Sequence, residues 1–550
     1  MKIKFLGAAT SVTGSCYLIT TKTHKFIIDC GLFQGNKTLE KGNFEEFAFD
    51  PRNIDFMILS HAHIDHSGRI PLLVKRGFKG RIYCTTSTAD LVGIMLKDSG
   101  YIQEKEAQWD NKKAQRLGRT PVEPLYTMED ATRSLKNLEP YLYEQTIQIN
   151  DSIKFRFRDA GHILGSAIVE IWIEEEGKVN KLVFSGDLGM KNKPILNDPV
   201  NIDEADYLIM EATYGNRTHE TIDESLEEFI DIIVKTIKRG GTVVIPSFAV
   251  GRTQDLIYEL NMYYEHHEEF KKILENIMVY IDSPLAISAT EIFRRNAQDF
   301  DEETRKHILS GDNPLDFKNL KFVRTSQESK ELNFNDEPKI IIASSGMAEA
   351  GRIKHHLKHH LWKETSSVVI VGYQAADTLG RLLVEGVKDV FIFGEKIKVR
   401  AEIYSLEGFS GHADKEGLFE WLTAFKKFPK KVFLVHGEYD SKVAFAERIK
   451  AELNHVVQVV EGVSEFDLES EIDASEPVDL LVEKRARCKD IIKLRQKLEK
   501  IQGELDSVVN NANLVLDRGL MQERLEEISN IILELEESTI KLGANVTENK

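Results

Sequence analysis

Four potential metal ligands lie within six residues of this chain, in the sequence His-Ala-His-Ile-Asp-His at residues 61–66. The run follows residues 55–60, which are apolar enough to form a buried strand, so its side chains converge from a loop at a strand end. Imidazole nitrogen and carboxylate oxygen are ligands that suit zinc. A polar turn with surface histidines explains one such residue but not this density. The run therefore predicts a metal centre.

Candidates for the remaining ligands stand at other predicted strand ends. His162 lies in Asp-Ala-Gly-His-Ile-Leu-Gly, Asp187 in Ser-Gly-Asp-Leu-Gly, and His436 in Val-His-Gly-Glu. Each borders glycine, which lets the backbone approach a crowded site without a side chain in the way. We therefore expect loops from distant parts of the chain to meet at one packed site.

The chain changes its pattern near residue 206. Before it come short β-rich runs at 2–6, 25–29, 55–60, 82–85, 153–157, 167–173 and 182–184, with a helix expected around 87–117. After it, strands alternate with helices: we expect strands at 207–210, 242–245, 277–281, 340–343 and 368–371, and helices near 222–238 and 252–265. This alternation predicts a parallel-sheet α/β domain inserted into the first domain.

Five segments are expected in all. They are a first domain at 1–205, the insert at 206–400, a return to the first domain at 401–463, an acidic linker at 464–478, and a helical hairpin or coiled coil at 479–550. Apolar residues in the last segment fall three and four apart, which is heptad spacing. A hairpin packed on its own chain and an arm that forms a homodimer fit this spacing equally well.

Composition indicates where the protein is expected to work and what it is expected to bind. No stretch approaches the roughly 18 to 20 apolar residues that span a bilayer, and the first residues do not resemble a signal peptide, so we expect a cytoplasmic chain with no membrane partner. The four scattered cysteines suggest reduced, structural thiols. The net charge of −17 argues against broad electrostatic coating of nucleic acid but leaves room for a local basic cleft.

Together these motifs resemble the metallo-β-lactamase superfamily, and specifically its β-CASP branch of nucleic-acid hydrolases, over roughly residues 1–460. Asp29, the 61–66 run, His162 and Asp187 match the four metallo-β-lactamase motifs, and Glu211, His412 and His436 match the β-CASP motifs. Ser-His-Ala-His-Ile-Asp-His-Ser-Gly-Arg and Ser-Ser-Gly-Met-Ala look more like nucleases of the cleavage-and-polyadenylation type than like ribonuclease J. The resemblance implies an α/β fold: an αββα sandwich with an inserted β-CASP domain, to which the C-terminal helical hairpin is added.

The resemblance also implies two zinc ions. Carried over residue by residue, His61, His63 and His162 would hold one ion, Asp65, His66 and His436 the other, with Asp187 bridging both. Asp29 would orient the histidine loop through hydrogen bonds. Related di-iron proteins carry a carboxylate where His63 stands, so zinc is preferred over iron, with manganese as a further candidate.

Two metal ions can share and deprotonate a water, which predicts a bridging hydroxide as the attacking group. A phosphodiester also needs its leaving oxygen protonated. We expect His412 to be that acid and Glu211 to orient it, so the predicted catalytic residues are Asp65, Glu211 and His412.

Single-stranded RNA is the expected substrate, because the most similar motifs belong to RNA-processing members of the family. Its phosphates could be gripped by backbone N–H groups at serine and glycine, and by arginine; the candidates are Arg252, Ser344, Ser345, Arg352 and Arg381. The run Lys354-His-His-Leu-Lys-His-His is interpreted as a helix with a basic face near the cleft.

The leading hypothesis is thus a zinc ribonuclease that leaves 5′-phosphate and 3′-hydroxyl ends. Two alternatives remain: a hydrolase of a small ester, thioester, lactone or phosphodiester on the same fold, and a non-catalytic RNA-processing scaffold. The insert with Glu211 and His412 disfavours the first, and the intact ligand set disfavours the second. The sequence leaves endonuclease and 5′-exonuclease activity equally open.

Overall fold

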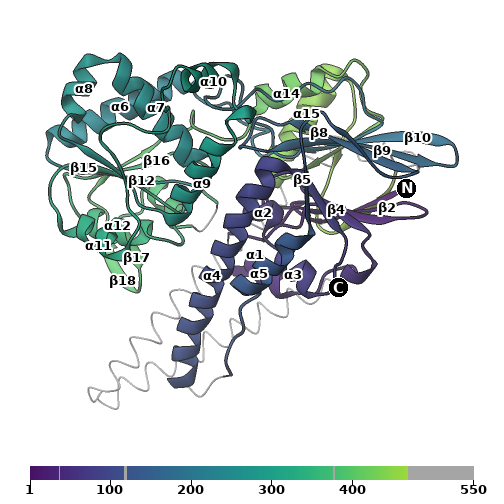
Figure 1. Cartoon of the computed structure of the whole chain (residues 1–550), viewed down its shortest axis with the longest axis horizontal. Helices are drawn as coiled ribbons and strands as arrows, with labels where there is room; N and C mark the ends of the chain where they lie inside the picture. The colour runs from purple at the N-terminus through teal and green to yellow at the C-terminus, as the bar shows by residue number, and fades with distance from the viewer. Residues whose placement is uncertain (36, 117–119, 376–377, 469–550) are drawn as a thin grey trace, which may run out of the picture. The chain divides into compact units, whose positions relative to one another are not determined.

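The computed structural model describes residues 1–468 except 36, 117–119 and 376–377. Two seven-stranded sheets and one six-stranded sheet make up its framework (Figure 1). The predicted hairpin at 479–550 and Cys488 lie outside the described residues. None of the helices in the described ranges is long and apolar enough to cross a membrane.

The first sheet has the strand order β22-β1-β2-β3-β4-β5-β6. Its strands are β1 (Lys2–Gly7), β2 (Cys16–Thr20), β3 (Lys25–Ile28), β4 (Phe56–Ile58), β5 (Arg81–Thr85), β6 (Leu138–Tyr141) and β22 (Ser464–Asp467). Strand β22 occupies the beginning of the segment predicted to be a linker. That prediction is wrong for these four residues, because β22 pairs with β1 and its Phe466 packs on Phe5 and Phe433.

The second sheet has the strand order β21-β20-β11-β10-β9-β8-β7. Its strands are β7 (Thr146–Asn150), β8 (Ile153–Asp159), β9 (Ala167–Glu175), β10 (Lys178–Phe184), β11 (Tyr207–Glu211), β20 (Lys431–Val435) and β21 (Gln458–Val459). Strand β11 was predicted to open the insert. It lies instead in the middle of this sheet, parallel to β10 and β20.

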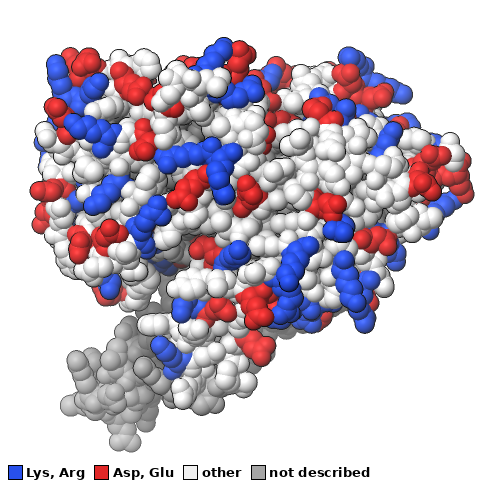
Figure 2. All heavy atoms as spheres, in the orientation of Figure 1, with Lys and Arg blue, Asp and Glu red and all other residues white. Residues whose placement is uncertain are grey.

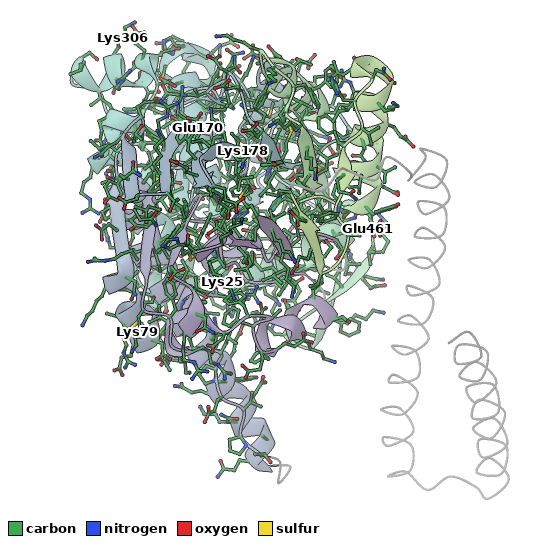
Figure 3. The ribbon with its side chains drawn as sticks, turned by 90° about the vertical axis from the view of Figure 1, so that its right-hand side faces the viewer. Lys25, Lys79, Glu170, Lys178, Lys306 and Glu461 are labelled. Carbon is green, nitrogen blue, oxygen red and sulfur yellow. The ribbon has the colours of Figure 1, made fainter. Side chains whose placement is uncertain are left out.

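Alternating apolar side chains of the two sheets face each other and form one core, which includes Ile3, Phe5, Tyr17, Phe26, Phe155, Phe157, Val169 and Phe184. Figure 3 shows these sheets with Glu170 of β9 and Lys25 of β3 labelled. Helices cover the outer faces: α2 (Ile64–Ser67), α3 (Ile70–Lys75), α4 (Thr86–Arg116) and α5 (Met128–Ser134) on the first sheet, α14 (Lys415–Thr423) and α15 (Tyr439–Leu453) on the second. The short helix α1 (Lys37–Lys41) precedes them. The predicted αββα sandwich is confirmed.

The insert is built on an all-parallel sheet of order β14-β13-β15-β12-β16-β19. Its strands are β12 (Thr242–Pro246), β13 (Met278–Ile281), β14 (Leu320–Phe322), β15 (Lys339–Ala343), β16 (Ser367–Ile370) and β19 (Glu402–Ser405). Strand β19 lies past residue 400, the predicted end of the insert. It extends the parallel sheet beside β16, so the predicted limit is about five residues too early.

Helices flank this parallel sheet (Figure 1). They are α6 (Ile222–Lys238), α7 (Arg252–His266), α8 (Glu268–Leu274), α9 (Pro284–Arg295), α10 (Glu302–Leu309), α11 (Ser326–Phe334), α12 (Ile353–His360) and α13 (Leu379–Val384), with a hairpin of β17 (Asp389–Ile392) and β18 (Glu395–Lys398). Helix α6 begins where predicted because Thr221 and Glu224 form a capping box around its first turn. The carboxyl ends of parallel strands meet at one edge, so this sheet presents its loops together.

Both charge signs are interspersed on the face shown in Figure 2, where lysine and arginine neighbour aspartate and glutamate. The face in this view therefore carries no broad basic coat. Cys16, Cys30 and Cys84 are buried and unpaired, as expected for structural thiols.

Candidate metal centre

Seven side chains from four loops converge where the two sheets of the sandwich end. The loop after β4 supplies four of them, and the loops after β8, β10 and β20 supply one each. Their ligand atoms form two groups, each within 4.8 Å: His61, His63, His162 and Asp187 in one, Asp65, His66 and His436 in the other. The structure thus brings together all seven residues predicted as metal ligands.

The spacing inside the groups fits a shared cation. The Nε2 of His61 and the Nε2 of His162 each lie 3.2 Å from the Nδ1 of His63, and the Nε2 atoms of His66 and His436 lie 3.1 Å apart. A tetrahedral zinc with Zn–N distances of about 2.0–2.1 Å holds its ligand atoms about 3.3 Å apart.

Asp187 lies between the two groups. Its Oδ2 is 3.5 Å from the Nε2 of His61 and 3.3 Å from the Nε2 of His66, and its Oδ1 is buried without a hydrogen-bond partner. A buried, unpaired carboxylate oxygen is costly unless a cation or a donor meets it. This donor set therefore fits two metal ions that share Asp187.

Acceptor groups behind the histidines fix which ring nitrogen carries the proton. A carbonyl and a carboxylate can only accept, so the Nδ1 of His162 donates to the oxygen of Gly411 at 2.9 Å and that of His66 donates to Asp29 at 2.7 Å. The Nδ1 of His436 meets the hydroxyl of Thr213 at 3.0 Å, and that hydroxyl donates to Glu211. In each case the Nε2 lone pair is left to face the ligand group, as a metal site requires.

The histidine loop is anchored by Asp29. Ser60 donates to this carboxylate from its backbone N–H and from its hydroxyl, both at 2.8 Å. Asp29 and His436 have left-handed backbones, with φ of 58° and 47°, which is uncommon outside glycine and costs conformational energy. The surrounding contacts hold both residues in these conformations, so the position of the ligands depends on them.

Electrostatics favour neutral imidazoles in the first group. Burial disfavours the charged ring and lowers the pKa of His63 to about 4, and it also lowers the pKa values of His61 and His162. Burial opposes the charge on His66 as well, but the carboxylates of Asp187 and Asp65 outweigh it and raise the pKa of His66.

His412 and Glu211 form a pair beside the ligand groups. The Nδ1 of His412 lies 3.1 Å from Glu211 Oε2 and 4.0 Å from Asp187 Oδ2. Glu211 is fully buried, whereas the side chain of His412 is 18% exposed. Burial disfavours the imidazolium, but Glu211 overcomes this and raises the pKa of His412 to about 9. Asp187, Glu211 and His412 also satisfy metal-ligand spacing, so the arrangement allows His412 to be an acid or a ligand.

Three family models match the chain. They are the metallo-beta-lactamase superfamily at residues 9–247, the Beta-Casp domain at 253–383, and the Zn-dependent metallo-hydrolase RNA specificity domain at 396–460. A ribonuclease of Thermus thermophilus is 36% identical over 81% of this chain and 95% of its own. The chain belongs to the metallo-β-lactamase superfamily, β-CASP branch. The predicted resemblance is confirmed.

Two archaeal relatives from Methanocaldococcus jannaschii extend the comparison. An RNase J-like protein is 33% identical over 81% of this chain and 95% of its own, and a transcription termination factor is 32% identical over 82% of this chain and 69% of its own.

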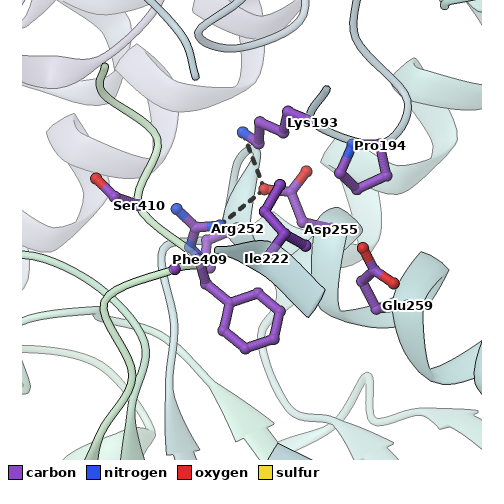
Figure 4. Close-up of a pocket in the computed structure, with 9 residues that line it drawn as sticks. Lys193, Pro194, Ile222, Arg252, Asp255, Glu259, Phe409 and Ser410 are labelled. Carbon is purple, nitrogen blue, oxygen red and sulfur yellow. Dashed lines mark hydrogen bonds and ion pairs between the residues drawn. The ribbon is translucent and has the colours of Figure 1, made fainter. Parts of the chain in front are cut away.

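Arg252, one of the residues predicted to bind phosphates, is buried. Its Nη1 is 3.0 Å from Asp255, which also pairs with Lys193 at 3.0 Å, and Lys193 in turn donates to the backbone oxygen of His162 (Figure 4). Arg252 therefore ties the start of α7 to the loop that carries His162.

The other predicted phosphate contacts lie at the end of β15 and near it. Ser344 and Ser345 are partly exposed, and Arg381 pairs with Glu385 at 2.7 Å. Arg352 is held by Asp282 at 2.6 Å and by the backbone oxygens of Val323 and Arg324, so two of its guanidinium nitrogens are bound within the β-CASP domain.

The histidine-rich helix α12 has the basic exposed face that was predicted, but two of its four histidines do not lie on that face. His356 and His360 are buried, and His356 contacts Asp282 at 2.7 Å and Asn333 at 2.9 Å. Only Lys354, His355, Lys358 and His359 are left partly or fully exposed. Half of the histidines thus belong to the core of the insert.

Glu259 lines the pocket in Figure 4 with Lys193, Arg252 and Asp255. Burial, with repulsion from Asp255 and Asp223, raises its pKa from 4.5 to about 7. Between these values the folded state keeps a proton that the unfolded chain has lost, so stability falls as pH rises. Glu259→Gln should therefore stabilise the protein by up to about 3 kcal/mol at pH 8 and have little effect at pH 4.5.

Urea unfolding at the two pH values measures this difference. Glu265→Gln, which changes an exposed carboxylate on the same helix, serves as the control and should show no such pH dependence. Equal stabilisation by Glu259→Gln at both pH values would contradict the assignment.

Proposed function

We propose that this protein is a two-zinc ribonuclease that cuts phosphodiester bonds of single-stranded RNA and leaves 5′-phosphate and 3′-hydroxyl ends. The observation that carries the proposal is the His412–Glu211 pair, whose imidazole lies 4.0 Å from Asp187, between the two ligand groups. A proton donor at this position serves a reaction with a poor leaving group, which a phosphodiester has and a thioester lacks. The relatives named ribonuclease and RNase J-like protein support RNA as the substrate.

His61, His63 and His162 would hold one zinc, Asp65, His66 and His436 the other, and Asp187 both. Bound there, the ions supply an activated water and neutralise charge on the phosphate. Sets of histidine nitrogen and carboxylate oxygen favour zinc, and manganese is the alternative. Of these ligands Asp65 and His63 are the more exposed, so the substrate reaches the centre from their side.

His412 would protonate the leaving oxygen. Cleavage that leaves a 5′-phosphate breaks the bond between phosphorus and the 3′-oxygen, which departs as an alkoxide unless it receives a proton. Glu211 holds the Nδ1 of His412, so Nε2 is the nitrogen available to give that proton. Glu211 is thus a positioning residue, and Thr213 and the backbone N–H of Leu188 hold it in turn.

Phosphates flanking the cut bond would meet Ser344, Ser345 and Arg381, which are at least partly exposed. Carboxylates already bind the guanidinium groups of Arg252 and Arg352. A role for them in positioning the loops fits these ion pairs better than direct contact.

The proposal is tested with one unstructured RNA, labelled at its 5′ end and bearing either a triphosphate or a monophosphate. The protein is incubated with it after loading with zinc or manganese. Internal fragments with 5′-phosphates indicate an endonuclease, and mononucleotides released only from the monophosphate RNA indicate a 5′-exonuclease. Absence of cleavage with either metal, alongside hydrolysis of a small thioester, would overturn the proposal.

A further inference from the structure

One exposed aromatic side chain stands at the edge of the metal centre. Phe248, which follows β12, is 37% exposed, and its ring centroid lies 6.5 Å from that of His63. Other large apolar side chains are exposed in the described ranges, but Phe248 is the one whose ring neighbours a predicted metal ligand. Its position next to the reacting groups, rather than its exposure alone, requires an explanation.

The ring of Phe248 is held in place by loops of the β-CASP sheet. Strand β12 lies between β15 and β16, and glycine follows each of these neighbours closely. A Cβ on Gly346 would come within 2.6 Å of the Phe248 ring, and one on Gly372 within 3.9 Å. The hydroxyl of Thr253 also donates to the backbone oxygen of Phe248 at 2.7 Å. The ring therefore rests on backbone at Gly346, while the residue stays 37% exposed with its ring 6.5 Å from that of His63.

We propose that Phe248 is the surface on which a nucleobase of the substrate stacks, at or next to the bond that is cut. This inference rests on the proposed function. A flat aromatic ring with an open face binds a base by stacking, and every base offers such a face, so the contact tolerates any sequence. Bases inside a duplex are already stacked and paired. Phe248 would therefore favour an unpaired strand.

Backbone support distinguishes this contact from a flexible surface residue. Tyr and Trp rings gain rigid contact area at low entropic cost, and the same holds for a phenylalanine whose ring is already fixed. Because Gly346 holds the ring before the substrate arrives, little conformational freedom is lost on binding. The base that stacks there would place its own phosphate close to the ligand groups.

The experiment uses a set of RNAs in which one base at a time is removed near the cut site, leaving the sugar and phosphate intact. Cleavage by the metal-loaded wild-type protein should fall by roughly 5- to 100-fold at one position, the range expected for one stacked base. Phe248→Leu should cleave intact RNA more slowly than the wild type by a similar factor. Removal of that base should not lower the rate of Phe248→Leu any further. In Phe248→Trp, removal of the base should again lower the cleavage rate, as it does in the wild type.

Equal rates of wild type and Phe248→Leu on the RNA that lacks this base show that the metal centre is intact in the variant. Phe391→Leu changes another exposed phenylalanine of the insert, away from the ligands, and should behave as wild type. If removal of the base lowers the cleavage rate of Phe248→Leu by as large a factor as that of the wild type, the inference is overturned. Failure of the wild type to cut any RNA would instead refute the proposed function.

Discussion

Replacing Asp187 with alanine is expected to release metal and to lower RNA cleavage by roughly 1,000-fold or more. Groups that only support a metal ligand already contribute about 10- to 100-fold to affinity or activity, and Asp187 faces both ligand groups. Without its carboxylate, five histidine rings would have to hold two cations with Asp65 as the one remaining anion among the ligands. Metal content by mass spectrometry and the cleavage rate on a single-stranded RNA measure the two effects.

Asp203→Ala is the matched control, because Asp203 is an exposed carboxylate whose partner is Lys426. It should keep the wild-type metal content and rate. Circular dichroism of Asp187→Ala establishes that the fold survives. Retention of both the metal and the activity in a folded Asp187→Ala protein would show that these ligand groups are not the reaction centre.

His412→Ala is expected to lower cleavage of ordinary RNA by roughly 100- to 10,000-fold, the range for loss of a general acid. The loss should shrink at least tenfold on an RNA whose cut bond carries sulfur in place of the 3′-oxygen. A thiolate leaves without a proton, so this substrate does not need His412. Rates on the two RNAs, compared between variant and wild type, separate proton donation from other roles.

The same variant decides whether His412 is an acid or a ligand, since its spacing to Asp187 and Glu211 allows both. If His412 is an acid, His412→Ala should keep the wild-type metal content. If His412 is a ligand, the variant should lose one ion. His266→Ala, at the exposed end of α7, serves as the control. An equal loss of rate on the oxygen and sulfur substrates would refute proton donation by His412.

The fold was predictable where a motif or a long pattern marked it. The helix at 222–238 was predicted with its observed limits, and a capping box marks its start. The strand Cys16–Thr20 was missed: four of its five residues are buried, so it lacks the alternation of a half-exposed strand. Sheet membership of β11 was missed because its partner strand β20 lies beyond the insert.

The site was predictable from residue types at strand ends, and the structure brings those residues together. The supporting contacts were not predictable. Thr213 lies two residues after Glu211 in a recognised motif, yet its link to His436 depends on the pairing of β11 with β20. Arg252 was interpreted as a phosphate contact, because a sequence does not reveal that Asp255 one turn later faces Lys193 from another domain. Phe248 carries no motif signal of its own beyond an aromatic residue at a strand end.

The pairing of β11 with β20 also bears on how the molecule matures. These neighbouring strands of the second sheet flank the whole insert in the sequence, so β11 remains an unpaired edge on that side until Lys431–Val435 has been synthesised. His436, its hydrogen bond to Thr213 and the second ligand group all wait for that strand. A nascent chain that ends before β20 therefore lacks a complete metal centre. Such an enzyme has no activity on RNA until most of its own translation is complete.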